Sequence, residues 1–511
     1  MSQLKKGAFL SYITIILTNG IGLVLTPFMI RMLGDAEYGL YMLIGALIGY
    51  ISVLDLGLSN TIVRFVAKYK ALNDRKGEEN FLATTMLIYT VISAIIVVCG
   101  LVMYFNLESI FNKLTPDQMG KAKLMFAILI FNLAITLPGG AFTAICSAYE
   151  KFVFPRTLNI IKYLSRSVLV VGLLFMGGDS VAIVMLDTVL NIVVIGLGAY
   201  YVFRNLKVSF RLHRFEMPLV TEIFSYSIWI FIFAMVGQFQ WQSGQIILGM
   251  VPVPEMRNIP NAITTAVAIY GVGITLGTYY GAFSTAISGV FLPRATQMTV
   301  LEASRDELTT MMIKIGRFSL ISLLPILGGF LLYGRQFVQL WVGDTYAPSW
   351  MIAVIIMFSY TLPLVQSFAN SMLEARKKFR FKAITYISLI VLGTAIGAYL
   401  LPRFGFLGLI CGSTGGWILS QIIMNFYYQK VMHLDIGRFF AALLHRLLPV
   451  FIVILALGYV IDWIPGHNWA NLIIKIFLFT GVFGILTYKF GMNADETATI
   501  KGFMPAFLRK K

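Results

Sequence analysis

Long apolar stretches alternate with short polar connections along the whole chain. A helix that crosses the hydrocarbon core of a bilayer needs about 20 mainly apolar residues, and these stretches have that length. The pattern therefore predicts an all-α polytopic membrane protein with about fourteen transmembrane helices. The expected spans are 9–30, 38–57, 81–104, 122–146, 157–176, 180–203, 222–250, 262–291, 310–334, 349–373, 383–401, 405–429, 439–463 and 469–490.

The composition agrees with this pattern and excludes several classes of protein. Hydrophobic residues make up 58% of the chain and charged residues 12%, whereas soluble domains carry about 25% charged residues. The net charge of +17 does not indicate nucleic-acid binding, because the basic residues form short clusters between apolar stretches. Cysteines and histidines are scattered without metal-ligand spacing, and no phosphate-binding Gly-Lys loop occurs. No cofactor is expected.

The basic residues also predict the orientation of the chain in the membrane. Cytoplasmic loops are rich in Lys and Arg. If the N-terminus is cytoplasmic, the inner connections and adjoining helix ends hold 32 of the 40 basic residues, and the outer ones hold 8. We therefore expect both termini in the cytoplasm. No outer loop is longer than roughly twenty residues, so a membrane polymerase or another enzyme is disfavoured.

Similar segments recur at a nearly constant distance and indicate an internal duplication. Thr-Leu-Pro occurs at 136–138 and 361–363, Lys-Phe-x-Phe at 151–154 and 378–381, and Ser-Tyr at 11–12 and 225–226. Offsets of 225, 227 and 214 residues correspond to six helices, an even number. The copies then share one orientation, which predicts two six-helix lobes related by a pseudo-twofold along the membrane normal.

The duplication divides the chain into an N-terminal lobe, a C-terminal lobe and a remainder of two helices with a cytoplasmic tail. Their expected bounds are 1–215, 216–435 and 436–511. Glycines at helical spacing, such as Gly45 and Gly49, predict close helix packing, and so do the glycines of the Gly408–Gly416 stretch.

Basic residues at membrane depth are the first candidates for a binding site, because ionisable groups in the bilayer are costly and usually face a cavity. Lys162 and Arg166 are four residues apart and share one helix face. Arg64 and Arg294 lie near the inner ends of their spans, where they either bind substrate or anchor the topology. Such groups suit a diphosphate loaded from the cytoplasm.

Acidic and amide residues complete the set of candidates. Asp187 shares a helix face with Asn191 and either pairs with Arg166 as a structural bridge or couples transport to H⁺ or Na⁺. Asp55 is a second candidate for ion coupling, and Arg64 is expected to follow it on the same helix. The expected seventh span carries several glutamines that either bind sugar or join helices, of which the candidates are Gln238, Gln242 and Gln245.

Several segments near the N-terminus resemble one known family. They are KKGAFLSY at 5–12, LTPFMIRMLG at 25–34, EYGLY at 37–41 and LDLGLSNTIVRFVAKY at 54–69. These segments are similar to the polysaccharide transporter family, the O-antigen and oligosaccharide flippases of the multidrug/oligosaccharidyl-lipid/polysaccharide exporter superfamily. The resemblance implies the two-lobed fold of these flippases and of the related MATE transporters, and it implies alternating access.

The resemblance also implies a substrate and partners. The substrate would be an undecaprenyl-diphosphate-linked glycan, moved from the cytoplasmic to the periplasmic leaflet, and the partners a polysaccharide polymerase or chain-length regulator. Related peptidoglycan-precursor flippases carry arginines on their first helix, whereas the first span here offers only Asn19 before Arg31. An O-antigen or capsule repeat is therefore favoured, and in those relatives the last two helices hold the lipid tail.

Other classes of transporter stay open at this point. An ion-coupled drug antiporter of the same superfamily would share the fold, but a basic cavity suits cationic drugs poorly. A major-facilitator carrier would share the parallel repeat, yet the loop after the second span, ALNDRKGEEN at 71–80, lacks that family's pattern.

Overall fold

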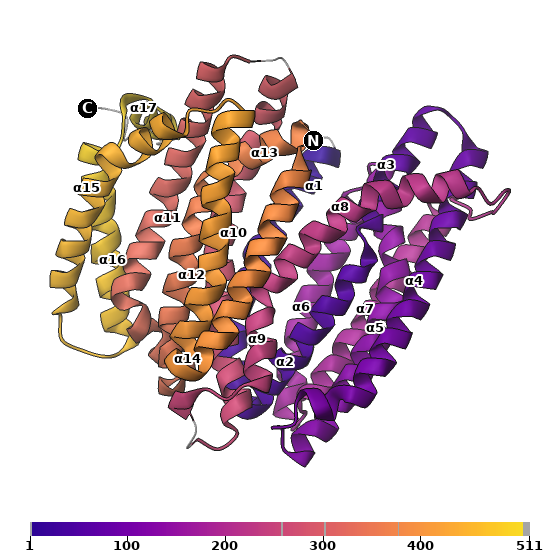
Figure 1. Cartoon of the computed structure of the whole chain (residues 1–511), viewed down its shortest axis with the longest axis horizontal. Coiled ribbons are helices and arrows are strands. Elements are labelled where there is room, and N and C mark those ends of the chain that lie inside the picture. The colour runs from indigo at the N-terminus through magenta and orange to yellow at the C-terminus, as the bar shows by residue number, and fades with distance from the viewer. Residues whose placement is uncertain (1–2, 257–258, 301–302, 377, 504–511) are drawn as a thin grey trace. The chain divides into compact units, whose positions relative to one another are not determined.

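The computed structural model describes residues 3–256, 259–300, 303–376 and 378–503, and in these residues it contains helices and no strands (Figure 1). The first half holds α1 Gln3–Leu33, α2 Asp35–Ser52, η1 Val53–Asp55, α3 Leu58–Ala71, α4 Arg75–Ile110, α5 Pro116–Ala148, α6 Val153–Phe175, α7 Ser180–Arg204, α8 Met217–Trp241, α9 Ser243–Met250 and η2 Pro254–Met256. The second half holds α10 Ala262–Val300, α11 Arg305–Val342, η3 Asp344–Tyr346, α12 Ala347–Val365, α13 Ser367–Ala375, α14 Phe379–Val431, α15 Ile436–Asp462, α16 Trp469–Leu486, η4 Thr487–Gly491 and α17 Ala494–Phe503.

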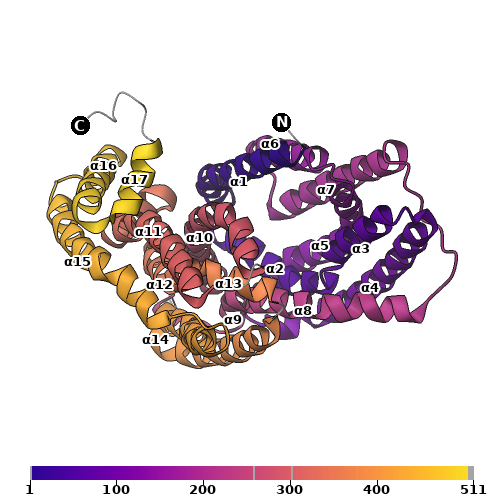
Figure 2. The same cartoon turned by 90° about the horizontal axis from the view of Figure 1, so that it is seen from above.

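Contacts divide the chain into two compact units. Unit 1 comprises 1–271 and 394–409, and unit 2 comprises 272–393 and 410–511. Within unit 1, α1 packs against α6, and α5 packs against α4 and α7 (Figure 2). Within unit 2, α11 packs against α12, α15 and α16. The three-part division expected from the repeat stays a prediction, and so does the pseudo-twofold.

Twelve helices in the described residues are long and apolar enough to cross a membrane. The prediction of an all-helical polytopic protein is therefore confirmed, whereas the count of fourteen is not. The expected span 222–250 is divided into α8 and α9 and is not among the twelve. The expected spans 383–401 and 405–429 lie in one long helical segment, 380–431.

Glycines explain the long segment α14. Gly405 has φ 55° and ψ −143°, outside the helical region, so two helices join there. The helix before the break packs its backbone closely against the helix after it. A Cβ on Gly393 would lie 2.7 Å from the Gly412 carbonyl oxygen, and a Cβ on Gly397 would lie 2.6 Å from the Leu409 carbonyl oxygen. The prediction that the Gly408–Gly416 stretch serves close packing is confirmed at Gly408 and Gly416, where a Cβ would lie 2.6 and 2.2 Å from a backbone carbonyl oxygen, but not at Gly415, which has open space.

A second break lies at the end of the expected span 38–57. Leu56 has φ 55° and Gly57 has φ 67°, so the chain takes two left-handed residues between η1 and α3. Such a conformation is costly for leucine, and it ends the helix that begins at Asp35. The expectation that Asp55 and Arg64 share one helix is therefore wrong: the first lies in η1 and the second in α3.

Candidate functional site

An ion pair lies inside unit 1, between α6 and α7. The Nε and Nη2 atoms of Arg166 donate to the two carboxylate oxygens of Asp187 at 2.5 and 2.8 Å. Nη2 also lies 3.3 Å from the hydroxyl of Tyr41 on α2. The arginine fork thus binds the carboxylate bidentately, the strongest geometry for such a pair. About a fifth of each charged side chain stays exposed.

Lys162 lies one turn before Arg166 and contacts the amide of Asn191, one turn after Asp187. Asn191 donates in turn to Asn132 Oδ1 on α5 at 2.9 Å. In the described residues the lysine ammonium has this neutral amide as its hydrogen-bond partner and no carboxylate within ion-pair distance. One cation of the cluster is therefore neutralised by a carboxylate and the other is not.

The helix period explains why these side chains meet. Residues four apart lie on one face of a helix, so α6 presents Lys162 and Arg166 together, and α7 presents Asp187 and Asn191 together. Arg166 is 13 residues from the first residue of α6 and 9 from the last. At 1.5 Å per residue it lies about 20 Å from one end and about 14 Å from the other, well away from both. The cluster thus lies near the middle of α6, a helix long and apolar enough to cross a membrane.

The structure separates the remaining basic candidates from this cluster. Arg64 is exposed on α3, beyond the break after η1. Arg294 lies on α10, and its side chain is outside the described part of the structure. The two arginines therefore stay predictions, with topology anchoring and substrate binding both open.

The glutamine candidates gather around the break between α8 and α9. Gln238 and Gln242 lie against α2, where a Cβ on Gly49 would be 2.8 Å from Gln238 Oε1 and 3.5 Å from Gln242 Cγ. Gln238 Oε1 is buried and accepts no hydrogen bond from the described residues. Gln245 on α9 is 2% exposed. Packing of Gln238 and Gln242 against a helix fits the hypothesis that these residues join helices.

Asp55 occupies a different place from Asp187. Its carboxylate lies within hydrogen-bonding reach of the Tyr89 hydroxyl and of the Gly57 backbone amide. Asp55 is thus not part of the Arg166 cluster, and a role in ion coupling stays a prediction for both acids.

Sequence analysis missed the polar residues that complete the cluster. Tyr41, Asn132 and Thr136 join it from α2 and α5, and Thr136 donates to Asn132 Oδ1 at 2.9 Å. Asn132 and Thr136 are four residues apart in an otherwise apolar stretch, which was a usable signal. Tyr41 offered none, because tyrosines are common near membrane interfaces.

Unit 2 also contains two polar clusters. Arg317 and Glu496 form a fully buried pair, and Lys475 pairs with Asp462 at 2.8 Å beside Gln336. In the part of the chain that the structure describes, no three His, Cys, Asp or Glu side chains come together as a metal site. The long apolar helices define a multi-pass membrane protein.

Comparisons with known proteins give the family. The profile of the family described as "Polysaccharide biosynthesis protein" matches residues 4–299, more than half of the chain. The chain belongs to this family, and the resemblance seen in its sequence is confirmed. A Shigella flexneri protein named "Putative O-antigen transporter" is 21% identical over 421 residues, which are 79% of this chain and 92% of that protein.

Solved structures share the fold. The lipid II flippase MurJ, in an inward closed conformation, aligns with a TM-score of 0.69 and 15% identity over 94% of this chain and 97% of its own. An inward-facing MATE multidrug transporter of the MOP superfamily aligns with a TM-score of 0.53 and 15% identity, over 82% and 98% of the two chains. The fold is therefore that of MOP-superfamily transporters.

Proposed function

We propose that this protein is a flippase that moves undecaprenyl-diphosphate-linked oligosaccharide units from the cytoplasmic to the periplasmic leaflet by alternating access. The product would feed the synthesis of O-antigen, capsule or exopolysaccharide. Support comes from the family, from the name of the Shigella relative and from the fold shared with a lipid II flippase. The proposal includes an inner-membrane location with both termini in the cytoplasm, and a polysaccharide polymerase or chain-length regulator as partner.

The observation that carries the proposal is the pair of cations in the polar cluster of unit 1. A diphosphate must lose hydration to cross the bilayer, and fixed cations replace that hydration. Lys162 has only a neutral hydrogen-bond partner, so a phosphate oxygen can replace Asn191 without breaking an ion pair. Arg166 uses Nε and Nη2 for Asp187 and Tyr41, while Nη1 donates to none of the described residues.

Asp187 has two functions in the proposed site. It holds the Arg166 side chain toward α7, and its negative charge reduces the net charge of the cluster, which holds two cations, from +2 to +1. Release of Arg166 to the diphosphate would leave this carboxylate without its ion-pair partner, so substrate binding and the state of Asp187 would be linked. Of the two candidates for coupling to H⁺ or Na⁺, Asp187 is therefore better placed than Asp55.

An apolar cavity in unit 2 supports the lipid part of the proposed substrate. It has a volume of about 330 Å³ and lies among α11, α12, α14 and α15, with Leu324, Phe358, Leu444 and Leu448 in its lining. Such a lining solvates a hydrocarbon chain. The resemblance placed a tail site in the last two helices, and α15 is the first of these; we propose that the prenyl tail lies here.

Flipping of a fluorescent undecaprenyl-diphosphate oligosaccharide in proteoliposomes tests the proposal. We expect protein-dependent movement that falls by at least tenfold in Lys162→Gln, because loss of one charge-assisted phosphate contact costs about 1.5–3 kcal/mol. The matched control is Lys151→Gln, which removes an exposed charge just before the same helix and is expected to flip normally.

Two other outcomes would change the conclusion. Equal movement in both variants would remove Lys162 from the site and leave the flippase function intact. No movement with several glycans under H⁺ or Na⁺ gradients, combined with ion-driven efflux of small amphipathic molecules, would favour an antiporter, the alternative that shares the fold with MATE transporters.

A further inference from the structure

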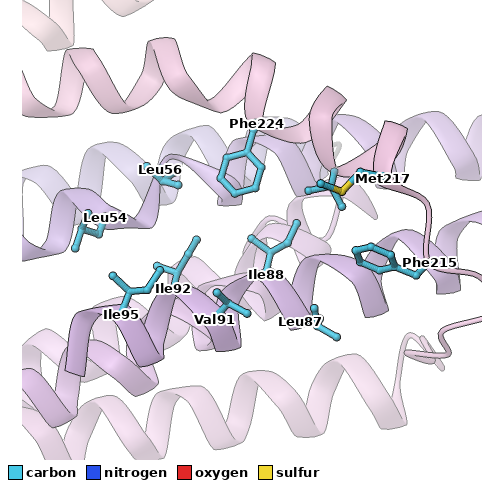
Figure 3. A pocket seen from close by; sticks show the side chains of 11 residues that line it. Leu54, Leu56, Leu87, Ile88, Val91, Ile92, Ile95, Phe215, Met217 and Phe224 are labelled. Atoms are coloured by element: carbon cyan, nitrogen blue, oxygen red, sulfur yellow. The ribbon is translucent and has the colours of Figure 1, made fainter. Parts of the chain in front are cut away.

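An apolar groove lies in unit 1, and its lining residues are distinct from those of the cavity in unit 2. It runs between α4 and α8 and is closed at its base by η1 (Figure 3). Its volume is about 330 Å³, and its lining is almost wholly hydrocarbon. Figure 3 shows Phe224 pointing from α8 toward α4, and Leu54 and Leu56 lying between the two helices.

The groove is open to its surroundings. Val91, Ile95 and Phe215 line it and are 52%, 48% and 53% exposed. In a membrane protein such side chains contact lipid, because exposure of that much apolar surface to water is unfavourable. The lining residues of α4 extend over 87–95, which is about 12 Å at 1.5 Å per residue. One leaflet of the hydrocarbon core is about 15 Å thick, so the groove has the length of a single leaflet.

One end of the groove is built by the connection between α7 and α8, and this connection is fastened to α4. Glu79 accepts one hydrogen bond from Ser209, and its other carboxylate oxygen lies 3.0 Å from Nε2 of the His213 ring. Asn80 Oδ1 accepts from the backbone amides of His213 and Arg214, both at 2.9 Å. Phe215, which follows directly, is thereby held over the end of the groove.

The same connection is strongly basic. Between Arg204 and Glu216 it carries four basic residues, Arg204, Lys207, Arg211 and Arg214, and a single acidic one, Glu216. All five are exposed. Arg211 is attracted to Glu79, whereas the hydrogen bond that the structure gives Arg214 comes from its backbone and leaves the guanidinium at the surface. Basic residues beside a membrane attract anionic lipids.

We propose that this groove binds one acyl chain of an anionic glycerophospholipid of the cytoplasmic leaflet, with the phosphate held by Arg211 and Arg214. The side of the membrane follows from the distribution of basic residues along the chain. The bound chain would contact Leu54 and Leu56, which flank Asp55 at the break between α2 and α3. The lipid would then stabilise the relative placement of η1, α4 and α8, to which the groove belongs.

Photolabelling in nanodiscs tests this assignment. The probe is phosphatidylglycerol with a diazirine in one acyl chain, compared with phosphatidylcholine carrying the same chain, and labelled peptides are mapped by mass spectrometry. We expect the ratio of phosphatidylglycerol to phosphatidylcholine labelling in 87–95 and 215–224 to exceed fivefold. In each of the single variants Arg211→Gln and Arg214→Gln this ratio should fall about fivefold. The reason is that one basic residue near an anionic surface contributes about 1 kcal/mol.

One further variant and two matched controls separate the groove from its surroundings. Val91→Phe fills the groove and should lower labelling by both probes. Val98→Phe enlarges an exposed residue of the same helix outside the lining, and Arg305→Gln removes an exposed charge from unit 2; neither should change the ratio. Misfolding would lower labelling by both probes, so it does not imitate the fall in the ratio expected for Arg211→Gln and Arg214→Gln, and Val98→Phe controls for the added bulk of Val91→Phe.

Two results would overturn the proposal. Equal labelling of the groove peptides by both probes would make the groove an ordinary lipid-facing surface. Displacement of the probe by undecaprenyl-diphosphate oligosaccharide, but not by unlabelled phosphatidylglycerol, would assign the groove to the tail of a prenyl lipid instead. Because the readout is binding, the test does not depend on whether the protein flips glycans.

Discussion

Replacing Glu496 with alanine removes the carboxylate that neutralises Arg317 in the interior of unit 2. Arg317 Nε and Nη2 donate to the two Glu496 oxygens at 2.5 and 3.0 Å, and the arginine is 4% exposed. Its remaining donors reach the carbonyl oxygens of Ala442 and Gly491 at 2.7 and 2.8 Å. The arginine therefore joins α11, α15, the end of η4 and α17, and cannot leave its site when its partner is removed.

The expected cost follows from burial. Removing one member of a buried pair costs about 3–5 kcal/mol, because the other charge stays buried and unpaired. Glu496 also accepts from the Asn493 backbone amide and donates its own amide to the Asn493 side chain, both at 2.9 Å. The substitution removes the first of these bonds, which adds about 1 kcal/mol, and keeps the second, which caps α17. The two carbonyl contacts that Arg317 retains reduce the loss. The free energy needed to open α17 should therefore fall by about 3–5 kcal/mol in Glu496→Ala.

Hydrogen exchange of residues 494–503, measured by mass spectrometry in detergent micelles, gives this opening free energy directly. The control is Asp306→Ala, which breaks the Arg438–Asp306 pair, also in unit 2 but with its two side chains 50% and 73% exposed. Exposed pairs contribute about 0–1 kcal/mol. The reasoning is refuted if Glu496→Ala changes exchange no more than Asp306→Ala does. Replacing both Arg317 and Glu496 with methionine should recover part of the loss.

Three further predictions test the packing and the polar contacts of the two units. Gly416→Ala should destabilise α14 by about 1–3 kcal/mol, since its Cβ would overlap a backbone carbonyl. In Gly415→Ala the Cβ meets nothing within 4 Å, so this control should be tolerated. Thermal denaturation followed by size-exclusion chromatography compares the two variants. Glu79→Gln should weaken the attachment of 205–216 to α4, and faster trypsin cleavage within that segment would show it, while unchanged cleavage would contradict the docking. Asp187→Asn should lower the free energy of unfolding by about 1.5–3 kcal/mol, because the charge-assisted hydrogen bonds to Arg166 are lost. Hydration of the partly exposed arginine reduces this loss. Denaturation curves equal to those of the wild type would mean that the pair contributes nothing to folding.

The candidate site was predictable in part, and the limit is physical. Helix periodicity alone places Lys162 with Arg166 and Asp187 with Asn191, because spacing within one helix is a local property. Which helix faces another depends on the packing of the whole unit. For that reason the bonds from Asn132 and Tyr41 to this cluster, and the separation of Asp55 from it, became visible only in the structure.

Residue order alone identifies this chain as a helical multi-pass membrane protein. A backbone in hydrocarbon must satisfy its own hydrogen bonds, and the length of each apolar stretch can be counted along the chain. The tertiary structure decided where those helices break and what they bury. Leu56 takes a left-handed conformation that no propensity favours for leucine, and Gly405 separates two helices within one apolar segment. Arg317 and Glu496 meet across 179 residues, a distance over which only packing, and no local rule, brings two charges together.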